Sequence, residues 1–548
     1  MKAQPQQTVK YLLKRTFDFM TSTGELKAFA RKASGLTRVV SAKDALTYNI
    51  NSTGMAYALV YASFGAGIYL GLDLAGSILP VLLLNIPIAL LYAYFSIAMP
   101  RTGGDYVWVS RSIHPVLGFM GSFMLSVVLI SWAASCPAWT LQWGIAPILR
   151  GLSVVYNDPG LITLADQISS PIAVQVYGLI SFIAVAFVIA RGIKFVIKTQ
   201  WVMFVIILVG LTAFIVTVVQ AGPATFQQRF DSMSGTTMKQ VISSAVSEGF
   251  WSEVTVSGIF LGMVYSFLNT VGFNFSVYYA GEVKDVRRTQ FISIVGAIAL
   301  FCFIMWAIYS TIYYGFGREF WHALSYIFNT GSASYTLPYP AFPQFLIIYF
   351  TTNPVVITLV GLSFALSAVV VQIVNPFIVT RSIFAWSFDR VVPTKLAELD
   401  RRYNSPYIAL ILVIILLMIC QALWLYTNWL GYLSYGITGL FISVAIAGLA
   451  GVIFPYRRKA IFEASPAIVK GKIGSVPVIS ILGALTFIIA VFVIYATLMP
   501  AYIGTINPVY LAVLFLTYIA AIVIYAASAA YHKKRIPLEL TFKEIPPE

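Results

Sequence analysis

The chain has 548 residues, of which 59% are hydrophobic and only 10% are charged, and its mean hydropathy is +0.85. A soluble domain carries about 25% charged residues, so this composition excludes a water-facing surface and predicts a polytopic membrane protein in a lipid bilayer. The net charge of +15 could indicate nucleic-acid binding. In a membrane protein, however, excess positive charge more often reflects topology, and we expect no nucleic-acid partner.

Residues 1–43 are polar and basic and are predicted to form a cytoplasmic tail, in which residues 9–20 could lie on the membrane as an amphipathic helix or stay disordered. Asp44 stands where a helix would begin. Twelve apolar spans of about 20 residues follow. Their centres lie near residues 57, 87, 132, 182, 210, 268, 301, 365, 416, 441, 489 and 517.

The distribution of positive charge supports this count. With the N-terminus inside, the outer loops hold only Arg150, Arg229, Lys239 and Arg318 of the 35 Lys and Arg residues. Cytoplasmic loops are enriched in Lys and Arg. The sequence therefore predicts a multi-pass protein of the cell membrane with both termini in the cytoplasm.

Two spans carry polar, glycine-containing interruptions near their middles. The first span contains Asn-Ser-Thr-Gly at residues 51–54, and the sixth contains Asn-Thr-Val-Gly at residues 269–272. A helix inside a bilayer can be broken only where the freed backbone groups are buried in protein or line a cavity. Paired interruptions in corresponding halves of a chain are typical of the binding site of a secondary transporter.

Other interpretations of these residues remain open. Gly54 and Gly272 could simply allow neighbouring helices to approach closely, and Asn51 and Asn269 could hydrogen-bond those helices. The Gly-Ala-Gly sequence at residues 65–67 is a rival position for the first break.

The sequence also lacks several functional signatures. None of the 20 acidic residues falls near the middle of a predicted span, and no phosphate-binding glycine loop is present. Cys136, Cys302 and Cys420 lie in apolar stretches and show no metal-ligand spacing. We therefore expect no metal or other cofactor and no enzymatic activity. A transported solute would draw on a gradient or on exchange.

Four segments resemble the amino acid–polyamine–organocation permeases. They are AMPRTGGDYVWVSRSIHPVLGFMGSF at 98–123, GIKFVIKTQ at 192–200, TVGFNFSVYYAGEVKDVRRTQ at 270–290 and RSIFAWSFDRVVPTKLAELDRRYNSPY at 381–407. They are similar to the loop before helix 3, the entry to helix 5, the helix 6 pattern and the helix 8–9 linker of that family. Asn274 replaces the family's usual Glu, and Val286 replaces its usual Pro.

The resemblance implies an all-α fold with an inverted repeat of five plus five helices, followed by two additional helices. The implied segments are the tail 1–43, the first repeat 44–221, an extracellular loop 222–254, the second repeat 255–456, spans 11 and 12 at 457–530, and a cytoplasmic tail 531–548.

The resemblance and the physics of broken helices predict the same site. Backbone amides at the first break can hold a carboxylate, because the N-terminus of a half-helix is positive. Backbone carbonyls at the second break can accept hydrogen bonds from an ammonium group. The predicted substrate-binding residues are Asn51, Ser52, Thr53, Gly54, Met55, Phe267, Leu268, Asn269, Val271 and Gly272.

The coupling ion stays open. Several members of the resembled family carry a Lys in helix 5 that replaces a sodium ion, but the corresponding position here falls near Ile206 or Ile207, where no Lys is present. A sodium ion could lie between helix 1 carbonyls and the hydroxyls of Ser363 and Ser367, which share one helix face. Alternatively, the chain is an exchanger or a carrier coupled to protons through another group.

The first functional expectation is an amino acid transporter that works by alternating access. The alternatives are a polyamine or organic-cation carrier of the same fold, or a membrane sensor or subunit that transports nothing. Several aromatic residues are candidates for gating the pocket or for ordinary packing, namely Phe267, Phe273, Tyr432, Tyr435 and Phe441.

Overall fold

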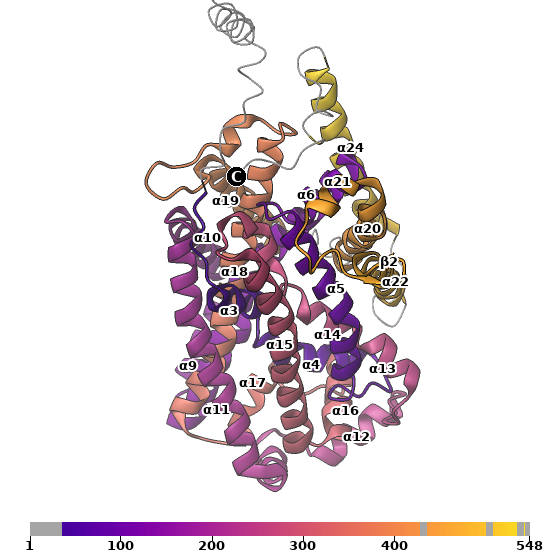
Figure 1. Cartoon of the computed structure of the whole chain (residues 1–548). Coiled ribbons are helices and arrows are strands. Elements are labelled where there is room, and N and C mark those ends of the chain that lie inside the picture. Colours follow the sequence, from indigo (N-terminus) through magenta and orange to yellow (C-terminus); the bar gives the residue numbers. More distant parts are fainter. Residues whose placement is uncertain (1–35, 428–435, 500–507, 534–541, 543–548) are drawn as a thin grey trace, which may run out of the picture.

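A computed structural model describes residues 36–427, 436–499, 508–533 and 542. The possible surface helix at residues 9–20 and the aromatic residues Tyr432 and Tyr435 lie outside the described residues. Within the described part, the chain is an assembly of long helices with a single short hairpin (Figure 1).

The elements follow one another in a simple order. Up to residue 282 they are α3 (Ala42–Ser52), α4 (Tyr57–Ile68), α5 (Ile78–Ala98), α6 (Asp105–Ser112), α7 (Pro115–Ala138), the π-helix η1 (Trp139–Ile145), α8 (Ala146–Tyr156), α9 (Gly160–Ile168), α10 (Pro171–Ala190), α11 (Ile193–Met233), α12 (Met238–Ser247), α13 (Val256–Gly262), α14 (Val264–Thr270) and the 3₁₀ helix η2 (Phe275–Glu282).

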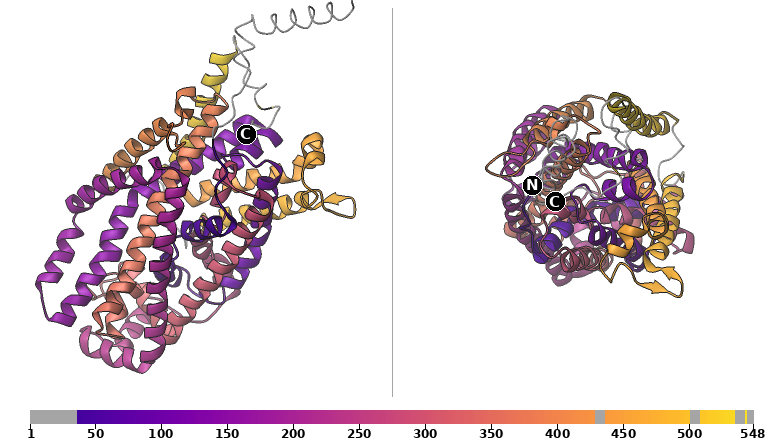
Figure 2. Two further views of the ribbon diagram at one scale, coloured as in Figure 1. Left: turned by 60° about the vertical axis from the view of Figure 1, so that its left-hand side comes forward. Right: turned by 45° about the horizontal axis from the view of Figure 1, so that its top comes forward.

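The second half has a similar composition. It contains α15 (Val286–Phe316), α16 (Arg318–Asn329), α17 (Pro343–Leu346), η3 (Ile347–Tyr349), α18 (Pro354–Phe388), η4 (Thr394–Ala397), α19 (Tyr407–Tyr426), α20 (Gly436–Arg457), α21 (Lys459–Ala464), β1 (Lys472–Ile473), β2 (Val476–Pro477), α22 (Val478–Thr497) and α24 (Pro508–His532). The hairpin formed by β1 and β2 projects from the side of the bundle (Figure 2).

Eleven helices of the described part are long and apolar enough to cross a membrane. They coincide with the predicted spans centred from residue 87 to residue 517. The first predicted span is occupied by α3 and α4, of 11 and 12 residues, which are too short to qualify singly. The prediction of an all-α polytopic membrane protein is confirmed, whereas the count of twelve spans and the inverted repeat stay predictions.

The start of α3 follows from a capping box. The Ser41 hydroxyl accepts the Asp44 amide, and the Asp44 carboxylate accepts the Ser41 amide at 3.1 Å. This reciprocal pair satisfies two backbone donors that a helix N-terminus leaves without partners. Asp44 also accepts a hydrogen bond from the indole of Trp201 in α11 at 3.0 Å, which ties the start of α3 to that helix.

The segment predicted as an outer loop, residues 222–254, is largely helical. α11 continues to Met233 through a kink at Gly222, where φ is +73°, and Pro223 follows immediately. Proline lacks an amide donor and its ring clashes with the preceding turn, so a kink is expected there. α12 then begins at a second capping box, made by Thr237 and Gln240.

The two ends of the bundle differ. α6 and α21 lie at one end (top of Figure 1), which we call the α6 end. Here Arg111 pairs with Asp389 at 2.7 Å, and both side chains are almost fully buried. About two turns earlier on α18, Arg381 pairs with Glu282 at 3.1 Å, again in a buried setting.

α12 and α16 lie at the opposite end, which we call the α16 end. α16 packs closely on α4, because a Cβ atom built on Gly67 would lie 2.3 Å from the Ser325 carbonyl oxygen. The Trp321 indole donates to the Ala62 carbonyl at 3.2 Å, and the Asn329 amide donates to the Ser63 carbonyl at 3.2 Å. α16 therefore covers α4 on this side.

Candidate functional site

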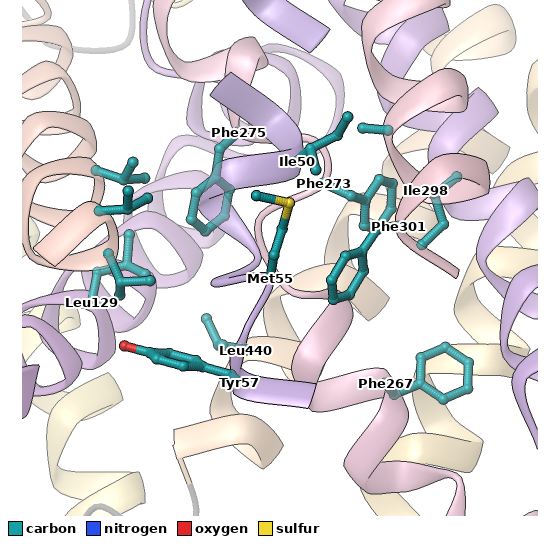
Figure 3. Packing of buried hydrophobic residues seen from close by; sticks show 14 of the residues in the cluster. Ile50, Met55, Tyr57, Leu129, Phe267, Phe273, Phe275, Ile298, Phe301 and Leu440 are labelled. Carbon is teal, nitrogen blue, oxygen red and sulfur yellow. The ribbon is translucent and has the colours of Figure 1, made fainter. Parts of the chain in front are cut away.

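The helix in the first predicted span is interrupted between α3 and α4. α3 ends at Ser52, α4 begins at Tyr57, and Gly54 between them has a φ of +64°. This left-handed conformation suits glycine because it has no Cβ atom. Figure 3 shows Met55 in the linking segment, surrounded by buried hydrophobic residues that include Phe275.

A second interruption follows α14. α14 ends at Thr270, Val271 has an extended ψ of 125°, and Gly272 has a φ of +116°. The chain then continues at Phe275 as the 3₁₀ helix η2 rather than as an α-helix. Both interruptions fall on the polar, glycine-containing motifs of the sequence.

The two interruptions touch each other. A Cβ atom built on Gly272 would lie 2.5 Å from the carbonyl oxygen of Ser52 and 2.6 Å from its carbonyl carbon. A real Cβ atom does not approach backbone this closely, so glycine is required at residue 272 if the two segments are to keep this distance.

A buried hydrogen-bond network holds η2 against α3. The Asn49 amide donates to the Ser276 hydroxyl at 3.0 Å, and the Ser276 backbone amide donates to the Asn49 oxygen at 2.8 Å. Ser276 also donates to Gln290 in α15 at 2.7 Å. Because these groups are buried and paired, the network specifies how the two segments meet.

A cavity of about 590 Å³ lies beside the interruptions and extends along α4 toward α16. Its lining combines the two interruptions with α4, α7, η1, α16 and α18. The described residues that line it are Ser52, Thr53, Tyr57, Tyr61, Phe64, Ile68, Trp132, Trp139, Tyr265, Leu268, Val271, Phe275, Asn329, Val371 and Asn375. None of these lining residues is charged. The volume falls in the range of roughly 300–1,000 Å³ that is typical of small-molecule sites.

Four of the ten predicted substrate-binding residues line this cavity, namely Ser52, Thr53, Leu268 and Val271. The hydroxyls of the first two bond within α3: Ser52 donates to the Tyr48 carbonyl at 2.6 Å, and Thr53 donates to the Ile50 carbonyl at 2.7 Å. A hydroxyl that donates its proton in this way keeps oxygen lone pairs as acceptors.

The polar side chains of the other predicted residues point elsewhere. The Asn51 amide donates to the backbone and side-chain oxygens of Gln200 in α11, at 2.8 and 2.9 Å. The Asn269 amide nitrogen lies 3.4 Å from the Met305 sulfur in α15. Both asparagines connect the interruptions to neighbouring helices, as the alternative interpretation of these residues anticipates.

The four remaining predicted residues lie away from the large cavity. Gly54, Met55, Phe267 and Gly272 are not among the residues that line the large cavity. Phe267 is fully buried and makes an edge contact with Phe441, with ring centroids 6.2 Å apart.

Several amides at the first interruption have internal acceptors. The Gly54 amide donates to the Asn51 carbonyl at 2.8 Å, and the Tyr57 amide donates to the Gly54 carbonyl at 2.7 Å. The Ala56 amide donates to the Ser367 hydroxyl of α18 at 3.2 Å. These bonds define the shape of the linking segment without an α-helix.

Within the described residues, two backbone groups at the interruptions, the Met55 amide and the Val271 carbonyl, have no hydrogen-bond partner. Two neighbouring carbonyls do have partners. The carbonyls of Phe267 and Leu268 accept hydrogen bonds from the Thr270 hydroxyl and the Val271 amide, at 2.8 and 3.2 Å. Val271 lines the large cavity, whereas Met55 is fully buried and does not.

The two serines proposed for an ion have different surroundings. Ser367 contacts the first interruption through the Ala56 amide. Ser363 is buried, donates to the Val360 carbonyl of its own helix at 2.7 Å, and lies close to Gly210 of α11.

The sequence interpretation missed most of the cavity wall, which is aromatic. Tyr57, Tyr61 and Phe64 of α4 line the cavity, with Trp132 and Trp139 from the third predicted span. The residues of α4 could have been recognised, because positions i, i+4 and i+7 after a helix start lie on one face. The tryptophans give no comparable signal in the sequence.

A second, much smaller cavity of about 60 Å³ also borders the second interruption and shares the lining residues Val271 and Phe275 with the large cavity. It is lined by Gly272 and also by Asp105 of α6, which the sequence interpretation left in a loop. Burial raises the pKa of the Asp105 carboxyl to about 6, even though Tyr278 and Tyr92 face it as hydrogen-bond partners.

The fold and the site define a class, an α-helical polytopic membrane protein with a small-molecule cavity beside two interrupted helices. A family model described as amino acid permease matches residues 50–530. The chain therefore belongs to the amino acid permease family, within the amino acid–polyamine–organocation superfamily. This is a family of transporters and not of enzymes. A comparison with curated proteins finds no match.

Proposed function

We propose that this chain is a secondary active transporter that binds a zwitterionic amino acid at the two interruptions and carries it by alternating access. The observation that carries this proposal is the contact between Ser52 and Gly272 at the edge of a cavity without charged lining residues. A ligand with both a carboxylate and an ammonium group needs complementary dipoles rather than one fixed charge.

The α-carboxylate would lie at the first interruption, where the hydroxyls of Ser52 and Thr53 would donate to it after exchanging their present acceptors, the carbonyls of Tyr48 and Ile50, for the ligand. The ammonium group would lie at the second interruption, near the free Val271 carbonyl. Hydroxyls and carbonyls can hold opposite charges at short range without an ionised side chain. This arrangement favours an amino acid over a polyamine, because a buried cation would call for an acidic lining residue.

Topology and coupling belong to the same proposal. The distribution of Lys and Arg favours a cell-membrane protein with both termini in the cytoplasm, so that the α6 end faces inward. Coupling to sodium at Ser367 and the Ala56 segment, coupling to protons, and exchange are alternatives that one experiment can separate.

The test is transport by the purified chain in liposomes. Uptake of a labelled amino acid mixture and of labelled putrescine would be measured under an imposed sodium gradient, under a proton gradient, and with internal amino acid. We expect uptake or counterflow of amino acids but not of putrescine. Putrescine uptake alone would favour the organic-cation carrier, and no flux of any solute under all three conditions would favour the sensor or subunit.

A further inference from the structure

The wall of the large cavity is made mainly of aromatic rings. They come from separate parts of the chain, with Tyr57, Tyr61 and Phe64 on α4 facing Trp139 and Tyr265. An aromatic wall of this kind exceeds what is needed to hold the common backbone of an amino acid, so it bears on the side chain of the ligand.

Residues of α4 present their rings to the cavity at regular helical spacing. Tyr57, Tyr61 and Phe64 stand at positions i, i+4 and i+7, and Ile68 continues the same face. The rings of Tyr61 and Phe64 both lie close to Tyr265 of α14, with centroids 6.5 and 6.3 Å from its ring. α4 and α14 therefore share one ring surface.

The facing wall is fixed by the π-helix η1. Trp139 is its first residue and stacks on Trp143, with ring centroids 5.2 Å apart and an interplanar angle of 22°. Trp139 also makes an edge contact with Tyr57 across the cavity margin at 5.0 Å. π-helical turns are rare and are found frequently at functional sites.

Close packing behind this wall limits its movement. A Cβ atom built on Gly144 of η1 would lie 2.6 Å from the Cα atom of Ala365 in α18. This approach seats η1, which carries the indole rings of Trp139 and Trp143, directly on α18. Positioned rings of this kind favour a ligand with a matching shape over small ligands that leave the space empty.

The charge and polarity of the lining residues restrict the class of ligand further. The polar lining groups away from the interruptions are few, chiefly Asn329, Asn375 and the tyrosine hydroxyls. An ionised side chain here would lose its hydration without gaining an oppositely charged partner. A neutral ring would instead gain edge-to-face or offset-stacked contacts with the wall.

From these observations we infer that the substrate is a neutral amino acid with a large aromatic side chain, which lies in the cavity against the rings of Tyr61, Phe64 and Trp139. This inference rests on the proposed function, because it assumes that the amino acid backbone binds at the two interruptions. It adds a substrate class and assigns side-chain recognition to Tyr61 and Phe64, which are specificity-determining residues at the centre of the α4 face.

The test is equilibrium binding to the full chain in detergent, measured by calorimetry with phenylalanine, tryptophan, leucine, alanine, lysine and glutamate as free ligands. Ring burial and ring contacts together predict that phenylalanine and tryptophan bind at least about tenfold more tightly than alanine. Lysine and glutamate should bind more weakly than leucine. Binding of leucine, alanine, lysine or glutamate as tight as that of phenylalanine, or tighter, would overturn the inference and leave the proposed function standing. Absence of binding by all six would overturn both.

Substitutions on α4 test whether this helix recognises the side chain of the ligand. Phe64→Ala should reduce the preference for phenylalanine over alanine several-fold while changing alanine binding little, and Tyr61→Ala should act in the same direction. The matched control is Phe303→Ala, because Phe303 on α15 is 60% exposed and outside the cavity lining. An unchanged preference in both α4 variants, with normal folding, would contradict the assignment.

Discussion

The Cβ position of Gly272 points at the carbonyl group of Ser52, 2.5 Å from its oxygen. These residues are far apart in the sequence and belong to two different interrupted helices. Their contact brings the end of α3 and the end of α14 together beside the cavity, and it makes glycine at residue 272 a condition for the site.

We predict that Gly272→Ala abolishes or strongly weakens amino acid binding while the protein remains in the membrane. The added methyl group must push the α14 end away from Ser52, because the two atoms nearest to it, the carbonyl oxygen and carbon of Ser52, belong to the backbone. The control is Gly235→Ala, because Gly235 also has a positive φ of +75° but no described atom lies within 4 Å of its Cβ position. Equal binding by both variants in a calorimetric titration would contradict the role of the contact.

A second prediction concerns the buried pair of Arg381 and Glu282 at the α6 end. Removing one partner of a buried ion pair typically costs about 3–5 kcal/mol, because the other charge stays buried without compensation. Glu282→Gln and Arg381→Gln should each lower the thermal unfolding temperature in detergent. The double variant should lose much less than the two single losses combined. Strictly additive losses would show that the pair is not coupled.

The third prediction uses the raised pKa of Asp105. The folded protein keeps a proton on Asp105 that the unfolded chain releases between pH 3.8 and about 6. Stability therefore falls as pH rises through this window, by an amount that corresponds to about 3 kcal/mol for a two-unit difference in pKa.

Asp105→Asn removes this loss because the amide does not ionise. The variant should be more stable than the native chain at pH 7, and the difference should shrink toward zero near pH 4. The titratable side chains that face Asp105 are Tyr92 of α5 and Tyr278 of η2, and neither changes charge in this range. Denaturation curves at several pH values measure the effect, and a constant difference across them would contradict it.

The fourth prediction separates the two serines of α18. Ser367→Ala leaves the buried Ala56 amide without its acceptor, and an unsatisfied buried donor costs about 1–3 kcal/mol. Ser363→Ala should cost less, because the Ser363 hydroxyl only donates to a carbonyl of its own helix. If sodium couples transport through Ser367, the first variant should also raise the sodium concentration needed for half-maximal uptake. Identical behaviour of the two variants would remove Ser367 from the site.

The sequence was sufficient for the membrane class and the family, and its two glycine motifs coincide with the ends of α3 and α14. Both features are local, because an apolar span and a glycine with a left-handed backbone conformation each depend on a short stretch of sequence. The direction of individual side chains is not local. Asn51 turns to Gln200, a partner 149 residues away, and no pattern around Asn51 specifies that contact.

The cavity wall shows the same limit. Trp139 contacts Tyr57, a partner on another helix, and the adjoining π-helix η1 packs on α18 through Gly144. A sequence with aromatic residues at 15% of the chain offers many candidates, and the tertiary packing selects among them. The ion pairs of Arg111 and Arg381 were likewise hidden, because charged residues near span ends are usually expected to face water.

The most direct test of the central claim is an experimental structure of the chain with phenylalanine bound. We predict density for the carboxylate within hydrogen-bond distance of the hydroxyls at residues 52–53, for the ammonium group beside the Val271 carbonyl, and for the ring against Phe64 and Trp139. A ligand bound away from both interruptions, or an unbroken α-helix across residues 50–57, would contradict the account.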